Sequence, residues 1–190
     1  MQDVLGRYDF ENIMSRLSEK TQRLSEQEKK YAAAIYHYTD LGYQDVNFSL
    51  REGNVLDDKT EKTIAYIDSA LEWLGDYDNE KPVVRYSNLT ASTIDKIKMP
   101  NARLYIDSYT STSANQGFQY HTPREFKFII YRDRGSLISD YSVYPSEEEV
   151  LIPRSSLFEV LKFDESSKTI YLLLVDVEDL HLVINSSDEV

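Results

Sequence analysis

The chain has 190 residues, and its 33 acidic against 21 basic side chains give a net charge of −12. Hydrophobic residues make up 41% and aromatic residues 12%, which is enough to build a core and excludes a disordered acidic tail. The acidity argues against general nucleic-acid binding, which needs a basic surface, and favours a basic partner. No window approaches the roughly 18 apolar residues of a membrane span.

Several other classes are excluded by what the sequence lacks. It contains no cysteine, so we expect neither disulfides nor a thiolate zinc site. Its three histidines at 37, 121 and 181 have no ligand spacing, and we expect no metal. The N-terminus has no charged-then-apolar signal pattern, which indicates a cytoplasmic protein that does not use the Sec route. The length suits a single domain over 1–190, helical over 1–80 and β-rich over 81–190, and we expect a monomer.

The first predicted helices follow from apolar spacing and capping. Residues 9–24 carry one helical stripe of four side chains: Phe10, Ile13, Leu17 and Leu24. Ser25-Glu26-Gln27-Glu28 is a capping box, in which the serine side chain and the glutamate three residues later cap each other's backbone amides. A helix is therefore expected to run from there through Tyr38, and Leu41-Gly42 is expected to break it.

The next segment, 43–51, predicts a short helix. Tyr43, Asn47 and Arg51 are four residues apart in turn, so they lie on one face, beside an apolar face. A polar stripe on a surface helix is usually only solvated. A further helix begins at Asp57-Asp58 and ends at Gly75, with its buried face formed by Ile64, Ile67, Leu71 and Leu74.

After Lys81-Pro82 the pattern becomes strand-rich. Residues 83–86 read as a strand and 90–98 as a short helix. Further strands rich in Ile, Val, Tyr and Phe are predicted at 103–109, 126–131, 136–141, 148–152, 157–163, 169–177 and, more weakly, 181–184. Helices followed by antiparallel strands predict an α+β fold.

An acidic triplet, Glu147-Glu148-Glu149, directly precedes an apolar strand. On a strand, Glu147 and Glu149 share a face and Glu148 faces away. Two neighbouring carboxylates repel, which raises one apparent pKa and suits proton transfer or stabilisation of a developing cation. Taken alone, the triplet is more often a solvated acidic turn.

Arg85 lies inside an apolar strand, where a guanidinium needs a partner. Phosphate is a good partner because the guanidinium fork binds two oxygens. A structural ion pair with one of the many acids is the commoner alternative.

The run Tyr109-Thr110-Ser111-Thr112-Ser113 follows a predicted strand. Small hydroxyls there can orient a carboxylate, although a helix cap or turn is the commoner arrangement. A serine hydrolase is not favoured, because His121 is the only nearby base.

Taken together, and in this order along the chain, these features are more specific for one family than any of them is alone. The chain carries Tyr43, Asn47 and Arg51, then Arg85, then Ser111-Thr112-Ser113, then Glu147-Glu148-Glu149-Val150-Leu151-Ile152-Pro153. It resembles the arginine–serine–glutamate class of mono-ADP-ribosyltransferases, found among bacterial toxins and effectors and phage-encoded enzymes. The resemblance covers about residues 25–185. Tyr86, where many members have glycine, and a short stretch after Ser113 depart from the pattern.

The resemblance implies N-terminal helices packed on a strand-rich, two-sheet core, with NAD as co-substrate. Glu149 is then expected beside the ribose, with Ser111 orienting it. Arg85 and Arg51 are expected to hold the pyrophosphate. The remaining NAD-binding residues implied are Tyr43, Asn47, Thr112, Ser113 and Phe118.

The first carboxylate of E-x-E, Glu147, goes with arginine acceptors in this class. A carboxylate there can position a guanidinium and accept its proton. Tyr141 and Tyr144 lie in the turn that resembles the target-recognition loop and could clamp the acceptor by cation–π contact. Ordinary packing is the equal alternative for both.

The implied function is transfer of ADP-ribose from NAD to an arginine of a protein with a basic surface, with no membrane or nucleic-acid partner. An NAD glycohydrolase and a non-enzymatic acidic interaction module on a decayed scaffold stay open as alternatives. The expected place of action is a cytoplasm, which for a phage-encoded enzyme or an injected effector is that of the host cell.

Overall fold

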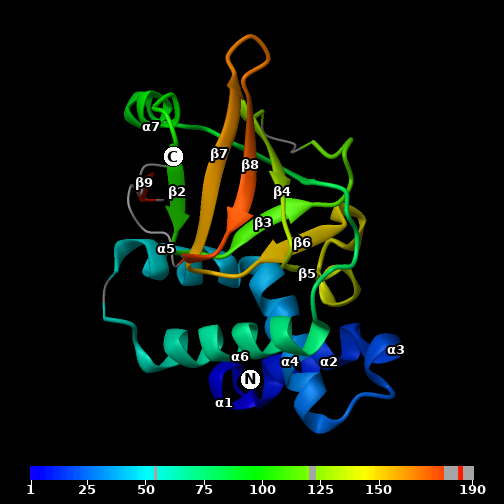
Figure 1. The fold of residues 1–190 in the computed structure, drawn as a ribbon. Helices are drawn as coiled ribbons and strands as arrows, with labels where there is room; N and C mark the ends of the chain where they lie inside the picture. Colours follow the sequence, from blue (N-terminus) through cyan, green and yellow to red (C-terminus); the bar gives the residue numbers. More distant parts are fainter. Residues whose placement is uncertain (54, 120–122, 178–183, 186–190) are drawn as a thin grey trace.

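The computed structural model describes residues 1–53, 55–119, 123–177 and 184–185. Helices up to Leu74 form one part of the molecule, and a sheet with one further helix forms the other (Figure 1). The helices are α1 (Gln2–Leu5), α2 (Arg7–Arg16), α3 (Ser18–Thr21), α4 (Glu26–His37), the π-helical turn η1 (Tyr38–Gly42), α5 (Tyr43–Glu52), α6 (Asp58–Leu74) and, within the strand-rich part, α7 (Ala91–Ile97).

The strands and short 3₁₀ turns fill the rest of the described chain. They are β1 (Val83–Ser87), β2 (Arg103–Ile106), β3 (Thr110–Ser113), β4 (Phe126–Tyr131), β5 (Ser136–Leu137), η2 (Ser139–Tyr141), η3 (Pro145–Glu147), β6 (Glu149–Ile152), β7 (Ser156–Asp164), β8 (Thr169–Val175) and β9 (Ile184–Asn185). No helix in the described residues is long and apolar enough to cross a membrane.

The local signals for the helices are confirmed. The Ser25–Glu28 capping box is present in both directions at the start of α4. Asp57 caps α6 by accepting from the Thr60 amide at 2.8 Å, and Gly75 ends that helix. The predicted apolar faces of these helices pack into one core with Tyr109, Ile138 and Leu151 of the strand-rich part, which fixes the helical part against the sheet.

The expected break at Leu41-Gly42 is wrong. The chain continues from α4 through the π-helical turn η1 into α5 without leaving helical geometry. A π-turn inserts extra backbone into a helix and is frequent at functional sites. Here the Thr39 hydroxyl accepts a hydrogen bond from the Val143 amide at 3.0 Å, which ties η1 to the turn that precedes Glu147.

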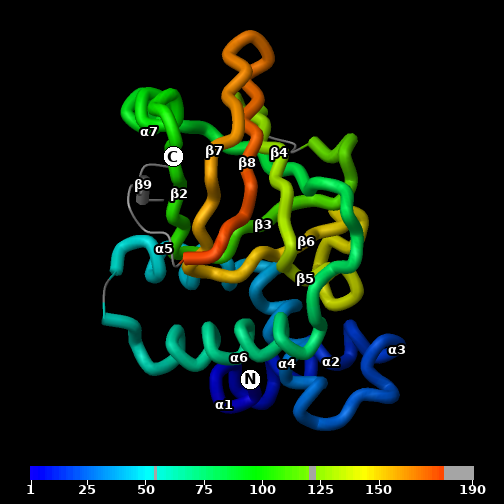
Figure 2. Tube along the Cα trace, viewed as in Figure 1, coloured from blue at the N-terminus to red at the C-terminus, as the bar shows by residue number. Residues whose placement is uncertain are grey.

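The strands are joined in one hydrogen-bonded order, β5-β6-β3-β1-β4-β8-β7-β2-β9. The α+β class is confirmed, but the two expected sheets are joined through β1. The link is narrow, since β1 pairs with β3 at a single residue pair, Val84↔Ser113, and with β4 at five. Two pairings, β4 with β8 and β2 with β9, are parallel rather than antiparallel. The tube in Figure 2 shows β3 and β6 crossing beneath β4 and β8.

Two strand predictions need correction. The predicted strand 136–141 is only β5, followed by the turn η2, and the predicted strand 103–109 ends at Ile106. The run Thr110–Ser113 is a strand of its own that pairs with β6, whereas a cap or turn is the arrangement that the sequence favours. Residues 181–183 of the weak last strand lie outside the described residues.

Candidate active site

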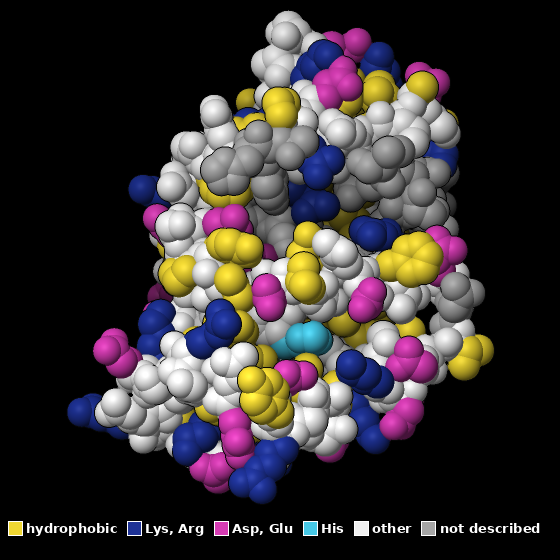
Figure 3. Space-filling view, turned by 180° about the vertical axis from the view of Figure 1, so that it is seen from behind, with side chains coloured by type: hydrophobic (Ala, Val, Ile, Leu, Met, Phe, Trp, Pro, Cys, Tyr) yellow, Lys and Arg dark blue, Asp and Glu magenta, His cyan; other side chains and the backbone are white. Residues whose placement is uncertain are grey.

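A cleft of about 920 Å³ opens between the helical part and the sheet, where β1 and β3 diverge. Its size suits a small-molecule ligand of cofactor size. Figure 3 shows a hollow on the face opposite to that of Figure 1, with Lys and Arg side chains in and beside it. The lining includes eleven of the twelve predicted site residues: Tyr43, Asn47, Arg51, Arg85, Ser111, Thr112, Ser113, Phe118, Tyr144, Glu147 and Glu149.

The antiparallel pairing of β3 with β6 brings the hydroxyl motif to the acidic motif. Ser113 is opposite Glu149, and Ser111 is opposite Leu151. The Thr112 hydroxyl donates to the Val150 carbonyl oxygen at 2.6 Å, which strengthens the pairing. Two motifs that are far apart in sequence are thereby held on adjacent strands at the cleft.

Glu149 is the first residue of β6 and only 8% exposed. Burial raises the pKa of its carboxyl to about 7. A hydrogen bond with the Ser111 side chain opposes this rise, the charge of Glu147 adds to it, and the charge of Arg85 opposes it. The site therefore holds a carboxyl that changes charge near neutral pH, in a place where water screens it little.

Glu147 is not on the same strand as Glu149, so the strand-alternation argument is wrong. Glu147 ends the 3₁₀ turn η3, and Glu148 has a left-handed backbone with φ of 47° that reverses the chain before β6 begins. The Ser113 hydroxyl donates to the Glu147 carbonyl oxygen at 2.6 Å, and the Ala114 amide donates to the Glu148 carbonyl oxygen at 3.0 Å. The turn thus brings Glu147, half-buried, into the same cleft.

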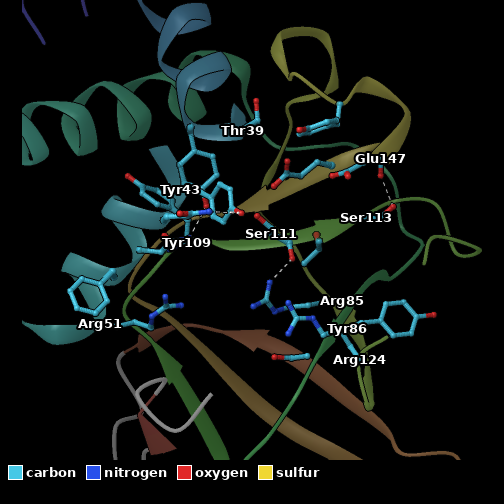
Figure 4. Close-up of a pocket in the computed structure, with 18 of the residues that line it drawn as sticks. Thr39, Tyr43, Arg51, Arg85, Tyr86, Tyr109, Ser111, Ser113, Arg124 and Glu147 are labelled. Carbon is cyan, nitrogen blue, oxygen red and sulfur yellow. Dashed lines mark hydrogen bonds between the residues drawn. The ribbon is translucent and has the colours of Figure 1, made fainter. Parts of the chain in front are cut away.

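Three guanidinium groups lie in the cleft. Arg85 of β1 donates from Nη1 to the Ser111 carbonyl oxygen at 3.0 Å, across the gap where the two strands diverge. Figure 4 shows Arg51, Arg85 and Arg124 on one side of Ser111 and Glu147 on the other. The cleft therefore has a cationic end and an acidic end.

The helix α5 carries the predicted polar face into the cleft. Tyr43, Asn47 and Arg51 all line it, while Val46 is buried on the neighbouring face. The Asn47 amide is engaged by the protein itself: Nδ2 donates to the Tyr38 hydroxyl at 3.0 Å, and Oδ1 accepts from the Tyr109 amide at 3.2 Å.

The two aromatic side chains predicted to clamp an acceptor are separated. Tyr144 lines the cleft and is 52% exposed. Tyr141 is not among the lining residues, and its ring packs on Trp73 of α6 with centroids 5.3 Å apart. Packing is therefore the role that the structure gives Tyr141.

Sequence reasoning missed several lining residues, among them Tyr38, Thr39, Phe48, Tyr86, Ser87 and Arg124. Tyr38 lies five residues before Tyr43, which is one π-helical turn, so a π-turn there would have placed it on the polar face of α5. Arg124 precedes β4 and carries no local signal. His121, the only base considered for a serine nucleophile, lies outside the described residues.

The arrangement is suited to chemistry at a centre that becomes positive. The buried carboxyl of Glu149 faces a space that the hydroxyl side chains of β3 and the carboxylate of Glu147 also face. Guanidinium groups beside this space can hold an anionic ligand. Among the described residues no group of three or more His, Asp or Glu side chains is placed to hold a metal ion.

The comparisons with known proteins agree with this geometry. The family model described as ADP-ribosyltransferase exoenzyme matches residues 11–181. A curated relative from Mycobacterium avium (strain 104), named "Putative NAD(+)--arginine ADP-ribosyltransferase Mav", is 37% identical over 133 residues. That stretch is 68% of this chain but only 15% of the relative.

Solved structures show the same fold. ADP-ribosyltransferase HopU1 of Pseudomonas syringae pv. Tomato DC3000 matches with a TM-score of 0.72 at 22% identity, over 87% of each chain. Exoenzyme S from Pseudomonas aeruginosa, in complex with human 14-3-3 protein beta and carba-NAD, matches with a TM-score of 0.70 at 20% identity, over 95% of this chain and 89% of that one. The chain belongs to the ADP-ribosyltransferase exoenzyme family.

Proposed function

We propose that the protein transfers ADP-ribose from NAD to arginine side chains of a target protein and releases nicotinamide. The observation that carries the proposal is the cleft that holds buried Glu149 beside Ser111, with Arg85 on one side and Glu147 on the other. Two of the comparisons support it. The name of the Mycobacterium avium relative includes arginine, and exoenzyme S was solved bound to carba-NAD.

NAD would lie along the cleft with its anionic pyrophosphate at the end that holds the three arginine side chains. Arg85 and Arg51 would bind the pyrophosphate, and Arg124 is placed to add a third positive charge. Phe118 offers an aromatic face for nicotinamide, and Tyr43 lines the adenosine side. Asn47 uses one amide N–H and its carbonyl oxygen on the protein, and its second amide N–H can contact the nucleotide from the same wall.

In the first step the bond between ribose C1′ and the nicotinamide nitrogen breaks. Nicotinamide leaves as a neutral molecule with the bonding electrons, and positive charge develops on the ribose, as in glycoside cleavage. The ionised Glu149 carboxylate stabilises that charge through the ribose 2′-hydroxyl, and its burial strengthens the interaction.

In the second step a guanidinium nitrogen of the acceptor bonds to C1′. An arginine is always protonated and a poor nucleophile, so it needs a base. Glu147 is half-buried at the acidic end of the cleft, where it can position the guanidinium and accept the proton that the nitrogen loses. Tyr144 can contact the same group by its exposed ring.

The acceptor would be a protein with an arginine in a basic surface. The net charge of −12 favours approach of such a surface, and less so at high salt. The proposed place of action is a cytoplasm, that of the producing cell or of a host cell, where NAD is available as co-substrate.

The test is incubation of the protein with labelled NAD and a bacterial or eukaryotic lysate, followed by mass spectrometry of the labelled proteins. We expect ADP-ribose on arginine, and none with Glu149→Ala. Labelling that is absent with the wild type, or equally strong with Glu149→Ala, would refute the proposal. Release of nicotinamide far beyond the ADP-ribose bound to protein would instead identify an NAD glycohydrolase.

A further inference from the structure

The helix α6 carries a carboxylate, Asp68, that the proposed reaction does not use. The Tyr109 hydroxyl donates to Asp68 Oδ1 at 2.5 Å, and Tyr109 directly precedes β3. Arg154 follows β6 by two residues and donates to Asp68 Oδ2 from Nε at 3.0 Å and from Nη2 at 2.9 Å. The ladder between the two strands ends at the pair Thr110↔Ile152, next to these contacts. One carboxylate on a helix therefore holds an end of both β3 and β6.

These two strands carry the hydroxyl and the carboxyl of the proposed reaction. Ser111 stands two residues beyond Tyr109 on β3, and Glu149 stands five residues before Arg154 on β6. Because the two strands are hydrogen-bonded to each other, a contact that fixes their ends fixes Ser111 and Glu149 as a pair.

Tyr109 also contacts the helical wall of the cleft. Its backbone amide donates to Asn47 Oδ1 at 3.2 Å, and its ring packs edge-on against that of Tyr38 with centroids 5.7 Å apart. Figure 4 shows Tyr109 on the side of the cleft where Tyr43 and Arg51 lie. The α6 carboxylate is thus connected through Tyr109 to the α5 wall as well as to the strands.

The ion pair between Asp68 and Arg154 constrains position more than it stabilises the fold. The two side chains are 37% and 38% exposed, and an ion pair that water reaches to this extent contributes little to the free energy of unfolding. Its geometry is restrictive, however. Two nitrogens of one guanidinium donate to one oxygen of the carboxylate, while the other oxygen accepts from the buried Tyr109.

We propose that Asp68 is a positioning residue, which holds the ends of β3 and β6 against α6 so that Ser111 and Glu149 keep a fixed orientation toward the α5 wall. Its effect on catalysis rests on the proposed role of Glu149 beside the ribose. A displacement of about 1 Å can lower the rate of an enzyme about a hundredfold, so small movements of these strand ends matter. NAD binding should depend less on Asp68, because the proposed pyrophosphate ligand Arg85 comes from a different strand, β1.

Amide hydrogen exchange, followed by NMR in the full chain without NAD, tests this directly. Two amides report on the strand ends: that of Tyr109, and that of Ser155, which donates to the Asp107 carbonyl oxygen at 3.2 Å. In Asp68→Ala we expect both to exchange at least about tenfold faster, while the amides of β8 change by less than about threefold. The variant is expected to fold, because the Ile64 carbonyl oxygen lies 3.2 Å from the Tyr109 hydroxyl and can accept its proton. Unchanged exchange at both amides, or the same acceleration throughout the sheet, would overturn the proposal.

Ser136→Ala is the matched control. It removes a different hydrogen bond between α6 and the sheet, which the Ser136 hydroxyl donates to the Leu71 carbonyl oxygen at 3.1 Å. Exchange at Tyr109 and Ser155 should stay within about twofold of the wild type. An acceleration equal to that in Asp68→Ala would make Asp68 one of several general contacts and would contradict the proposal.

A further variant separates the two strands. Arg154→Met removes the link to β6 and leaves the hydrogen bond between Tyr109 and Asp68, so we expect faster exchange at Ser155 and little change at Tyr109. In the Asp68→Ala background the same substitution should have no further effect, because the partner of Arg154 is already gone. An equal effect in both backgrounds would show that Arg154 acts without Asp68, against the proposal.

Kinetics measure the consequence for the proposed reaction. In Asp68→Ala we expect kcat for nicotinamide release to fall by about tenfold or more, with KM for NAD within about threefold of the wild type. A loss of kcat/KM that comes from KM alone would contradict positioning of Glu149. Because the hydrogen-exchange experiment uses no NAD, it tests the role of Asp68 even if the transferase activity is not found.

Discussion

The two carboxylates of the acidic motif are two residues apart but lie in different kinds of structure. Glu149 begins a strand, is paired with β3 through the ladder and is nearly excluded from water. Glu147 ends a 3₁₀ turn, is half-buried and is held through its backbone by Ser113. The strand supplies a fixed, poorly screened charge, whereas the turn presents a carboxylate to a partner that arrives from solvent. With the roles proposed for the two carboxylates, the difference predicts that bond cleavage and acceptor use are separable.

The largest expected effect tests the strand carboxylate. Glu149→Gln should lower kcat for nicotinamide release by about a thousandfold, because the developing positive charge loses its buried counter-charge. KM for NAD should change by less than about threefold, since the cationic end is intact. Glu148→Gln is the matched control, because its side chain is exposed and outside the cleft lining. Equal losses in both variants would contradict a special role for Glu149.

The same substitution should change stability with pH. The folded-state pKa of Glu149 is raised from 4.5 to about 7, so the folded state loses stability as pH rises through that window. Glu149→Gln removes this loss, and its unfolding free energy at pH 8 should exceed that of the wild type by on the order of 3 kcal/mol. Below pH 4 the two should coincide. Denaturant unfolding at both pH values measures it, and a difference that is independent of pH would argue against the buried acid.

The turn carboxylate should behave differently. Glu147→Gln should lower transfer to a guanidinium acceptor such as agmatine by about a hundredfold, because the acceptor loses its base. Nicotinamide release without acceptor should stay within about threefold of the wild type. Parallel assays of the two products decide it. A fall of both activities by the same factor would show that the two carboxylates act as one unit.

The cationic end should affect binding more than chemistry. Arg85→Lys should weaken NAD binding by at least about tenfold, because a lysine cannot form the two-pronged contact with phosphate. Calorimetry in a Glu149→Gln background measures binding without consumption of NAD. Arg16→Lys, an exposed change on α2, is the control. Unchanged affinity in Arg85→Lys would place the pyrophosphate elsewhere in the cleft.

The features that the sequence predicts correctly depend on residues that lie close together in the chain. The capping box at Ser25 and the common face of Tyr43, Asn47 and Arg51 depend on residues within two helical turns, and both are confirmed. The strand over Thr110–Ser113 was missed because small hydroxyl residues also favour turns. Its β6 partner is distant in sequence, and no local pattern records that pairing.

The remaining misses have related causes. The turn geometry at Glu147 depends on the left-handed backbone of Glu148, which the sequence of three glutamates does not indicate. The π-turn that aims Tyr38 and Thr39 at the cleft replaces an expected helix end. Tyr141 and Tyr144 share one turn and one residue type, yet only packing against Trp73 distinguishes them.

The most direct test of the account is the stoichiometry of the wild-type reaction with a saturating arginine-bearing protein acceptor. The two quantities are nicotinamide released and ADP-ribose bound to arginine. We expect about one ADP-ribose bound to arginine for each nicotinamide released, and in Glu147→Gln we expect the bound ADP-ribose per nicotinamide to fall toward zero. A wild-type ratio in which nicotinamide far exceeds bound ADP-ribose, unchanged by Glu147→Gln, would contradict the assignment of Glu147 to the acceptor and of the protein to arginine transfer.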